Sequence, residues 1–334
     1  MEHNPSHPYE GSTQNSVLAP EGERVVKIAE SFSNIVVTTD QYAYKIRKPI
    51  KDGLIDYSTF DRRLNCAQRE LSKGRIFSGD HLYITILPVT TLTDGKFLIG
   101  RETQPDNIAI KMFLFNDKDI LSNRIMDKRL PEDWESMVVN YLLSVHKKTK
   151  TDKKVGEYGH PNSLKYLLNF YHHQISDKCV DISLALTFNK ILSELEDFIN
   201  LHRSIFMSRL EGGYIRDNHG DLHTGNILLD INRDQIFAFD PIEYHMALSA
   251  VDTFSDISYL LFDLDFLERS DLSSSLEQKY IKQTGEDEVA DIMLAFYKSW
   301  RALVRAKVGL FLDGDQKSMV TSCLNLANHY LSKL

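Results

Sequence analysis

The sequence N-H-G-D-L-H-T-G-N-I-L-L, residues 218–229, is the part of this chain from which its fold can be inferred. It holds a carboxylate, Asp221, a carboxamide, Asn226, and then an apolar run that is typical of a buried strand. A second apolar run, 236–239, follows after a polar turn and leads into Asp240. If the two runs pair as a hairpin, Asp221, Asn226 and Asp240 lie at one end of a small sheet.

These three side chains have the chemistry that phosphoryl transfer requires. One carboxylate can orient a substrate hydroxyl, while an amide and a second carboxylate can bind the Mg²⁺ ions that bridge the phosphates of ATP. The pattern therefore predicts a kinase-type site. A zinc site at His219 and His223 is disfavoured, because Gly220 and Gly225 interrupt the helix that such a histidine pair needs.

The motif His-Gly-Asp-Leu-His-x-x-Asn-Ile, followed by an apolar strand and Asp-Pro-Ile-Glu at 240–243, resembles the aminoglycoside phosphotransferase and choline kinase group of the protein-kinase-like fold. The resemblance implies a two-lobed α+β fold, with a small antiparallel-sheet lobe and a larger, mostly helical lobe. It also implies ATP and Mg²⁺ as cofactors, Asp221 as the catalytic residue, and Asn226 and Asp240 as metal ligands. Glu243 would either steady the metal-binding loop or contact the substrate.

Other segments extend this resemblance over most of residues 25–310. Residues 40–49, 56–60 and 299–308 are similar to those of an uncharacterised bacterial subgroup of aminoglycoside-phosphotransferase-like proteins. Members of that subgroup are often fused to a P-loop ATPase domain. The present sequence contains no Gly-x-x-x-x-Gly-Lys-Ser/Thr motif.

The expected nucleotide-binding lobe begins at 25–28 with a first strand or a short helix, and two β-branched or alternating strands follow at 35–38 and 42–46. The second strand carries Lys45, which can neutralise ATP phosphates if a glutamate on the next helix holds it. That helix is predicted at 59–77, with Ser58 or Thr59 as its cap, and Glu70 in its middle is the candidate partner.

Two features of this lobe leave alternatives open. Lys111 is the alternative to Lys45 as the phosphate-binding lysine, because its segment Ile-Ala-Ile-Lys is similar to the Val-Ala-Ile-Lys motif of protein kinases. Its strand, however, comes after the helix and is better interpreted as the last strand before the hinge. No glycine-rich loop precedes the second strand. Ser31 and Ser33 are therefore the candidate phosphate-binding residues of the turn at 29–34.

The remainder of the chain is predicted to be mainly helical, and two of its helices carry charged side chains that need partners. Asp252 and Asp256 would share one face of a buried helix at 251–267. Asp256 would hold the backbone of the catalytic loop, and acceptance of substrate amines is the less favoured alternative for a buried pair. Arg301 and Arg305 would either pair with acidic residues of the substrate cleft or remain solvated. The predicted helices are at 119–126, 134–146, 162–171, 182–210, 251–267 and 291–312.

Length and composition limit the class of protein. We expect a flexible tail at 1–16, a nucleotide-binding N-lobe at 17–115 and a catalytic C-lobe at 116–334. An excess of 47 acidic over 39 basic residues argues against nucleic-acid binding. Three scattered cysteines, no signal sequence and no long apolar run suggest a cytoplasmic protein without a membrane span.

The sequence thus predicts an ATP-dependent kinase that phosphorylates a hydroxyl of a small molecule. Two alternatives remain: a protein kinase, and a nucleotide-binding pseudokinase with a regulatory role. The full set of Asp221, Asn226, Asp240, Lys45 and Glu70 argues against the pseudokinase, whereas the missing glycine-rich loop argues weakly for it. The identity of the acceptor and the oligomeric state are not determined by the sequence.

Overall fold

The computed structural model describes residues 17–101, 104–233, 235–312 and 314–334. The described residues form two compact units, one consisting of those between 17 and 119 together with Phe237–His245, the other of those within Ile120–Ile236 and Met246–Leu334. The tail predicted at 1–16 lies outside the described residues.

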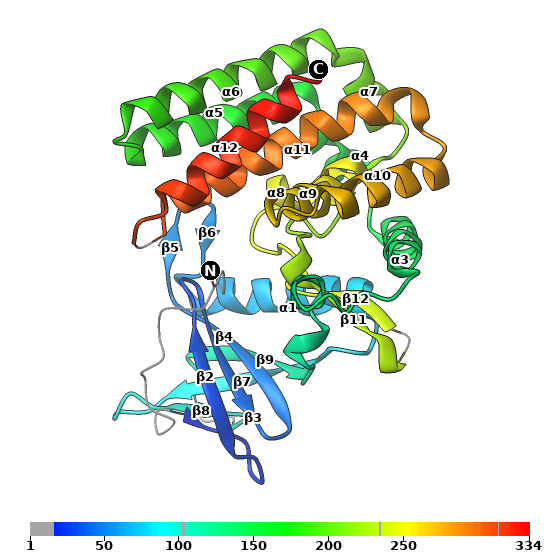
Figure 1. The fold of residues 1–334 in the computed structure, drawn as a ribbon. Helices are drawn as coiled ribbons and strands as arrows, with labels where there is room; N and C mark the ends of the chain where they lie inside the picture. Colours follow the sequence, from blue (N-terminus) through cyan, green and yellow to red (C-terminus); the bar gives the residue numbers. More distant parts are fainter. Residues whose placement is uncertain (1–16, 102–103, 234, 313) are drawn as a thin grey trace. The chain divides into compact units, whose positions relative to one another are not determined.

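The first unit is built on a seven-stranded sheet with the strand order β1-β8-β7-β9-β4-β3-β2. Its neighbouring strands are antiparallel, as predicted, except that β1 runs parallel to β8. Figure 1 shows these strands together with the helix α1 (Phe60–Ser78). The strands are β1 (Val17–Leu18), β2 (Val25–Glu30), β3 (Asn34–Thr39), β4 (Tyr42–Arg47), β7 (Tyr83–Thr91), β8 (Phe97–Ile99) and β9 (Asn107–Phe113).

The two faces of this sheet have different partners, and the alternation of side chains in β4 shows the division. Tyr44 and Ile46 are completely buried in a cluster that also includes Val37, Val89 and Ala109. The other face of the sheet packs against α1, which contacts β7 and β9. Because successive side chains of a strand point to opposite faces, Lys45 and Arg47 lie on the side of α1.

Helix α1 begins at the predicted position. Of the two candidate caps it uses Thr59, whose hydroxyl accepts a hydrogen bond from the Arg62 amide. The segment before it forms a short antiparallel ribbon of β5 (Lys51–Asp52) and β6 (Ile55–Asp56). A 3-10 turn, η2 (Asp117–Asp119), follows the last strand of the sheet.

The second unit is mainly helical. Helix α11 packs along α12 and α9, and α5 packs against α6 (Figure 1). The helices are α2 (Leu121–Met126), α3 (Trp134–Lys148), α4 (Lys153–Gly156), α5 (Pro161–Lys178), α6 (Ile182–Leu201), α7 (Arg203–Glu211), α8 (Met246–Ser249), α9 (Thr253–Phe266), α10 (Ser270–Thr284), α11 (Asp287–Gly309) and α12 (Lys317–Leu331). The strands and 3-10 turns are η3 (Glu157–Gly159), β10 (Ile215–Asp217), η4 (Thr224–Asn226), β11 (Ile227–Asp230), η5 (Ile231–Arg233) and β13 (Ala250–Asp252). The strand β12 (Gln235–Ala238) begins in this unit and ends in the first.

The predicted hairpin is present, since β11 and β12 form a two-stranded sheet. Two long predicted helices are corrected. The helix predicted at 182–210 ends at Leu201, and α7 starts after His202, whose imidazole packs on the Phe198 ring with centroids 4.3 Å apart. The helix predicted at 251–267 begins instead with β13, which pairs with β10.

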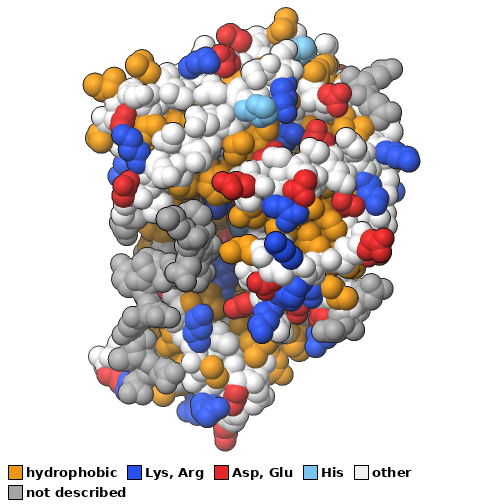
Figure 2. Space-filling model, viewed as in Figure 1, with side chains coloured by type: hydrophobic (Ala, Val, Ile, Leu, Met, Phe, Trp, Pro, Cys, Tyr) orange, Lys and Arg blue, Asp and Glu red, His pale blue; other side chains and the backbone are white. Residues whose placement is uncertain are grey.

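The described helices are too short or too polar to cross a membrane. The face in Figure 2 carries basic and acidic side chains interspersed, with a group of hydrophobic side chains at the upper left, where α5 turns into α6 in Figure 1. Val180, Ile182 and Leu186 are 95%, 77% and 66% exposed at this turn.

Candidate active site

Lys45 occupies a buried position on the central strand β4. Its ammonium lies 3.1 Å from Oε1 of Glu70 on α1 and also contacts the carboxylate of Asp240. Burial by itself lowers the pKa of Lys45, but the carboxylates of Asp240 and Glu70 outweigh burial and raise it. The lysine is therefore a fixed, charged group, and the predicted pair with Glu70 is present.

Lys111 is on the opposite face of the same sheet. It pairs in register with Tyr44, whereas Lys45 pairs with Ile110, so the two lysine side chains point to opposite sides. The Lys111 ammonium lies 3.4 Å from a Glu23 carboxylate oxygen and 3.5 Å from the centroid of the Tyr42 ring. These contacts give Lys111 a structural role on the face away from α1.

Glu70 and Glu243 are bridged by a buried arginine that the sequence interpretation did not use. Nη2 of Arg47 lies 2.5 Å from Glu70 and 2.9 Å from Glu243, and the Tyr57 hydroxyl donates a 2.6 Å hydrogen bond to Glu243. Burial raises the pKa of the Glu243 carboxyl in spite of the nearby guanidinium of Arg47. Glu243 is only 3% exposed, so of its two expected roles the structure supports steadying the loop that carries Asp240.

Tyr83 connects the same loop to α1. Its hydroxyl accepts a 2.9 Å hydrogen bond from the Asp240 amide and donates one of 3.3 Å to Glu70. Asp240 has a positive φ of 60°, which costs about 1–2 kcal/mol for a residue with a side chain. The hydrogen bond to its amide and the ammonium at its carboxylate hold Asp240 in this conformation.

The close approach of Tyr83 to α1 depends on a glycine. A Cβ atom built on Gly74 would lie 2.3 Å from Cε2 of the Tyr83 ring, which is a steric overlap. Glycine at this position thus allows the Tyr83 hydroxyl to reach both Glu70 and Asp240.

The candidate phosphate-binding serines lie in the turn between β2 and β3. The Ser31 hydroxyl is used within the turn, since it accepts from the Asn34 amide and donates to the Asn34 carbonyl. The Ser33 hydroxyl accepts from the Asn34 side chain at 2.9 Å, which leaves its own proton to donate. A contact of either serine with phosphate stays a prediction.

In the second unit, a buried aspartate holds the loop that carries Asp221. The carboxylate of Asp256 accepts hydrogen bonds from the His219 amide at 3.3 Å and the Gly220 amide at 2.9 Å, and it lies 3.2 Å from Nε2 of His146. This confirms the predicted structural role of Asp256. Gly220 has a φ of 83°, a left-handed conformation that favours glycine.

Arg301 does not have either of the roles expected for it. It is buried, and it donates to two backbone carbonyls, Gly220 O at 2.9 Å and Ser255 O at 3.1 Å. It therefore holds the loop that carries Asp221 through a carbonyl, whereas Asp256 holds the same loop through amides. Nothing in its helical spacing distinguished a backbone-binding arginine from a solvated one.

The expected face shared by Asp252 and Asp256 is also corrected. Asp252 precedes α9 and caps it, accepting from the Phe254 amide, and its carboxylate is bound by Arg209 at 2.5 and 2.7 Å. Both aspartates are structural, but they act on different neighbours.

Asp221 and Asn226 are brought together by the loop itself. The Asn226 amide nitrogen donates to the Asp221 carbonyl at 2.9 Å and to its carboxylate at 3.2 Å. Thr224, one of the four residues between them, donates from its amide and its hydroxyl to the Asp263 carboxylate, a contact that the sequence did not predict. The Asp221 side chain remains 37% exposed and so can meet a substrate.

The two predicted metal ligands fit Mg²⁺ by the chemistry of their atoms. The nitrogen of the Asn226 amide is used by Asp221, so its oxygen is the atom that can bind a cation. The Asp240 carboxylate is half-exposed. Carboxylate and amide oxygens are the donors that Mg²⁺ prefers.

Comparison with known proteins supports the fold. No protein-family model matches the chain. Relatives from Mycobacterium bovis and Mycobacterium tuberculosis, described only as uncharacterized proteins, are 24% identical over 291 residues, which is 86% of this chain. The chain spans about half (55%) of the length of these curated relatives.

Solved structures of small-molecule kinases have a similar fold. Ethanolamine kinase of Plasmodium vivax matches over 94% of this chain and 85% of its own, with a TM-score of 0.55 and 12% identity. Choline kinase of Cryptosporidium parvum matches over 96% of this chain and 92% of its own, with a TM-score of 0.53 and 11% identity. A choline/ethanolamine kinase family protein of Mesorhizobium loti matches over 92% of this chain and 90% of its own, with a TM-score of 0.55 and 12% identity. The chain therefore has the choline-kinase-like form of the protein-kinase fold, with a sheet unit and a helical unit.

Replacing Gly74 by Ala tests the packing of Tyr83. We expect the added methyl group to displace the Tyr83 ring and to lower the free energy of unfolding by about 1–3 kcal/mol, although alanine is the better helix former. Ser72→Ala, on the exposed side of the same helix, is the control and should change stability by less than about 0.5 kcal/mol. Chemical denaturation of both variants measures the difference, and a stabilised Gly74→Ala protein would contradict the packing described here.

The pH dependence of stability tests the role of Asp256. Burial raises its pKa, but the hydrogen bond and charge of His146, the charge of His219 and the Gly220 amide outweigh burial and lower it to about 2. A carboxyl with a lowered pKa stabilises the fold above its unfolded pKa near 4, and this contribution disappears as the pH falls toward 2. Asp256→Asn should therefore lower the free energy of unfolding by about 2–3 kcal/mol at neutral pH. The difference in this free energy between wild type and variant should become smaller below about pH 4.

The matched control for this experiment is Asp177→Asn, which changes an exposed aspartate on α5. Its effect on the free energy of unfolding should be small at every pH. If the gap between wild type and Asp256→Asn stays constant from neutral pH to about pH 2, the ionised carboxylate is not what holds the loop.

Proposed function

We propose that this protein transfers the γ-phosphoryl group of Mg-ATP to a hydroxyl group of a small molecule. The observation that carries the proposal is the buried Lys45 ammonium, held between the carboxylates of Glu70 and Asp240. A buried cation fixed in this way is suited to neutralise phosphate charge without reorganising. In kinases such a lysine is held by a glutamate, and the metal-binding aspartate belongs to the same constellation.

The remaining roles follow from the chemistry of each side chain. Asp221, which is partly exposed, orients the acceptor hydroxyl and takes its proton. Asn226 fixes Asp221 through its amide nitrogen and presents its oxygen to Mg²⁺, which Asp240 also binds. Mg²⁺, when bound, supplies positive charge to the phosphates of ATP.

The acceptor is proposed to be a small molecule. The similar solved structures include an ethanolamine kinase and a choline kinase, whose named substrates are amino alcohols. Amino alcohols are therefore the first class to test, followed by the amino sugars that the sequence resemblance suggested. A protein acceptor and a purely regulatory nucleotide-binding role are the alternatives that the experiment separates.

The first experiment is a measurement of ATP turnover by the purified chain with Mg²⁺. The acceptor panel contains amino alcohols, aminoglycosides, simple sugars and small proteins, and the control is Asp240→Ala. An acceptor-dependent rate that disappears in Asp240→Ala supports the proposal and identifies the acceptor class. Tight Mg-ATP binding without transfer favours the regulatory role, and a chain that does not bind nucleotide contradicts both.

Asp221→Ala separates chemistry from binding. We expect this variant to lose transfer by a factor of about 10³ or more, because the acceptor hydroxyl then lacks its general base and orienting group. The Kd for Mg-ATP, measured by calorimetry, should change little. A variant that loses nucleotide binding instead would show that Asp221 has a different role.

Lys45→Ala and Lys111→Ala form a matched pair of substitutions on the two faces of one sheet. Removal of the Lys45 ammonium should weaken ATP binding or turnover by about 10–100-fold, the range expected for a charge-assisted hydrogen bond. Lys111→Ala should leave both within about twofold and affect only stability, because its contacts are to Glu23 and Tyr42. The reverse result would show that the functional lysine has been misassigned.

A further inference from the structure

A side-chain amide links the turn between β2 and β3 to the buried charges of the sheet unit. Asn34 is the first residue of β3 and the cross-strand partner of Arg47 on β4. Side chains of directly paired residues point to the same face of a sheet, so Asn34 lies on the face that carries Lys45. Its amide oxygen lies 3.2 Å from Nη1 of Arg47, and its amide nitrogen lies 2.9 Å from the Ser33 hydroxyl.

Arg47 fixes which end of this amide faces which neighbour. A guanidinium has only N–H donors, so the atom of Asn34 beside it must be the oxygen. Arg47 is itself held by two buried carboxylates, Glu70 at 2.5 Å and Glu243 at 2.9 Å, and it is only 1% exposed. The amide of Asn34 therefore cannot turn over without placing its NH2 group against the guanidinium.

The same argument fixes the proton of Ser33. The NH2 group of Asn34 can only donate, so the Ser33 oxygen accepts and its hydroxyl proton points elsewhere. Ser33 is half-buried, and no acceptor for this proton is found among the residues that the structure describes. Each donor in a chain of hydrogen bonds polarises the next, so a hydroxyl at the end of a chain that starts at a guanidinium is a strengthened donor.

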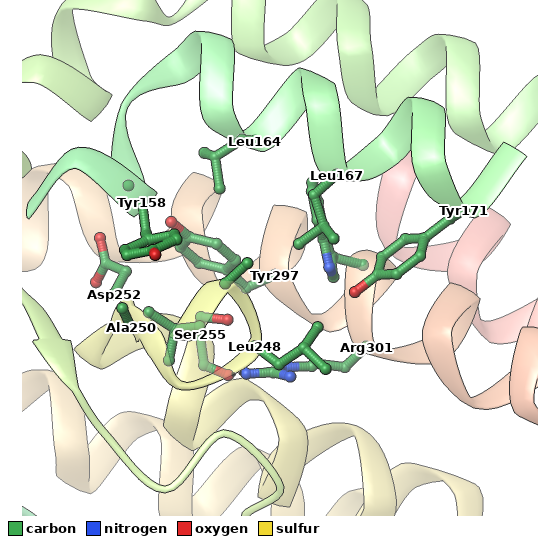
Figure 3. Close-up of a pocket in the computed structure, with 14 residues that line it drawn as sticks. Tyr158, Leu164, Leu167, Tyr171, Leu248, Ala250, Asp252, Ser255, Tyr297 and Arg301 are labelled. Atoms are coloured by element: carbon green, nitrogen blue, oxygen red, sulfur yellow. Dashed lines mark hydrogen bonds between the residues drawn. The ribbon is translucent and has the colours of Figure 1, made fainter. Parts of the chain in front are cut away.

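Arg301 of the second unit shows what distinguishes this arrangement. Figure 3 shows its guanidinium beside Leu248 and Ser255. Its described hydrogen bonds go to the carbonyl oxygens of Ser255 and Gly220, and a carbonyl has no proton to direct. Arg301 therefore orients backbone, whereas the chain that starts at Arg47 reaches a hydroxyl with a proton to donate.

We propose that Asn34, held by Arg47, is a positioning residue for the phosphates of ATP, and that it acts through Ser33. The Ser33 hydroxyl would donate to a phosphate oxygen, next to the face of the sheet on which Lys45 supplies positive charge. Ser31 is not suited to this role, since its hydroxyl donates to the Asn34 carbonyl within the turn. The inference rests on the proposed nucleotide site, and it gives a turn without glycines a side-chain donor for phosphate.

The first test separates the phosphates from the rest of the nucleotide. Calorimetry on the full chain gives the Kd of Mg-ATP and that of adenosine, which has no phosphate. Ser33→Ala should weaken Mg-ATP binding at least about tenfold and leave adenosine binding within about twofold. Ser33→Thr keeps the hydroxyl and should bind Mg-ATP within about threefold of the wild type. An equal loss for both ligands, or an unchanged Kd of Mg-ATP in Ser33→Ala, would overturn the role of Ser33.

The second test asks whether Asn34 acts through Ser33. Asn34→Asp keeps an oxygen for Arg47 but replaces the NH2 donor by an acceptor, so the Ser33 proton turns to the new carboxylate. We expect Mg-ATP binding to weaken at least about tenfold when Ser33 is present, and at most about threefold in the Ser33→Ala protein. If the added charge acted only by repelling phosphate, the factor would be the same in both proteins, and that result would overturn the role of Asn34.

The matched control is Asn65→Asp, which adds the same charge at an exposed position of α1. Its Kd for Mg-ATP should stay within about twofold of the wild-type value, because an exposed charge acts weakly through solvent. Circular dichroism confirms that each variant is folded.

The outcomes also distinguish this inference from the proposed function. Turnover by the wild type, with an unchanged Kd of Mg-ATP in Ser33→Ala and Asn34→Asp, contradicts only the inference. Mg-ATP binding that responds to both substitutions as expected, but without transfer to any acceptor, contradicts only the transferase activity. A wild-type chain that does not bind Mg-ATP contradicts both.

Discussion

The burial of the Glu70 carboxylate is the constraint on which the sheet unit depends. A carboxylate without solvent is tolerated only when donors surround it, because the cost of removing a charge from water is several kcal/mol. Lys45, Arg47 and Tyr83 supply these donors, and each of them also contacts the segment at 240–243. One buried acid thus sets the position of the lysine and of the predicted metal ligand together.

The helical unit repeats this principle with another acid. Asp256 is buried in α9, and two of its donors are backbone amides of the loop that precedes Asp221. Arg301 holds the carbonyl of the same loop, so the backbone at Gly220 is bound from both its donor and its acceptor side. In each unit, buried ionic side chains hold a loop that carries a predicted site residue. The loop carries Asp240 in the first unit and Asp221 in the second.

Contacts could be predicted from the sequence where the elements that make them follow each other along the chain, and not where the partners are distant. The Lys45–Glu70 pair was predicted from the order of its elements along the chain, a strand that carries a lysine and then a helix with a central glutamate, combined with the pattern known from kinases. The alternation of β4 places Arg47 on the face of Lys45, but its two glutamate partners are 23 and 196 positions away in the sequence. Such contacts are set by tertiary structure.

The errors in the helical unit have the same origin. The break at His202 and the strand before α9 occur within apolar runs whose helical pattern continues across them. Arg301 on α11 has ordinary helical spacing, and only its burial beside Gly220 O makes it a backbone ligand. The joint placement of Asp221, Asn226 and Asp240 stays a prediction from the hairpin of β11 and β12.

The opposite orientation of Lys45 and Lys111 also has a consequence for folding. If β4 slipped by one residue against its neighbours, every side chain of the strand would change face. Lys45 and Arg47 would then enter the apolar cluster around Val37 and Val89, while Tyr44 and Ile46 would face Glu70. Two buried cations without partners, and an acid deprived of its donors, make that misfolded state far less stable than the native one. The predicted ion pair of Lys45 and Glu70, together with Arg47, therefore also selects the correct strand pairing.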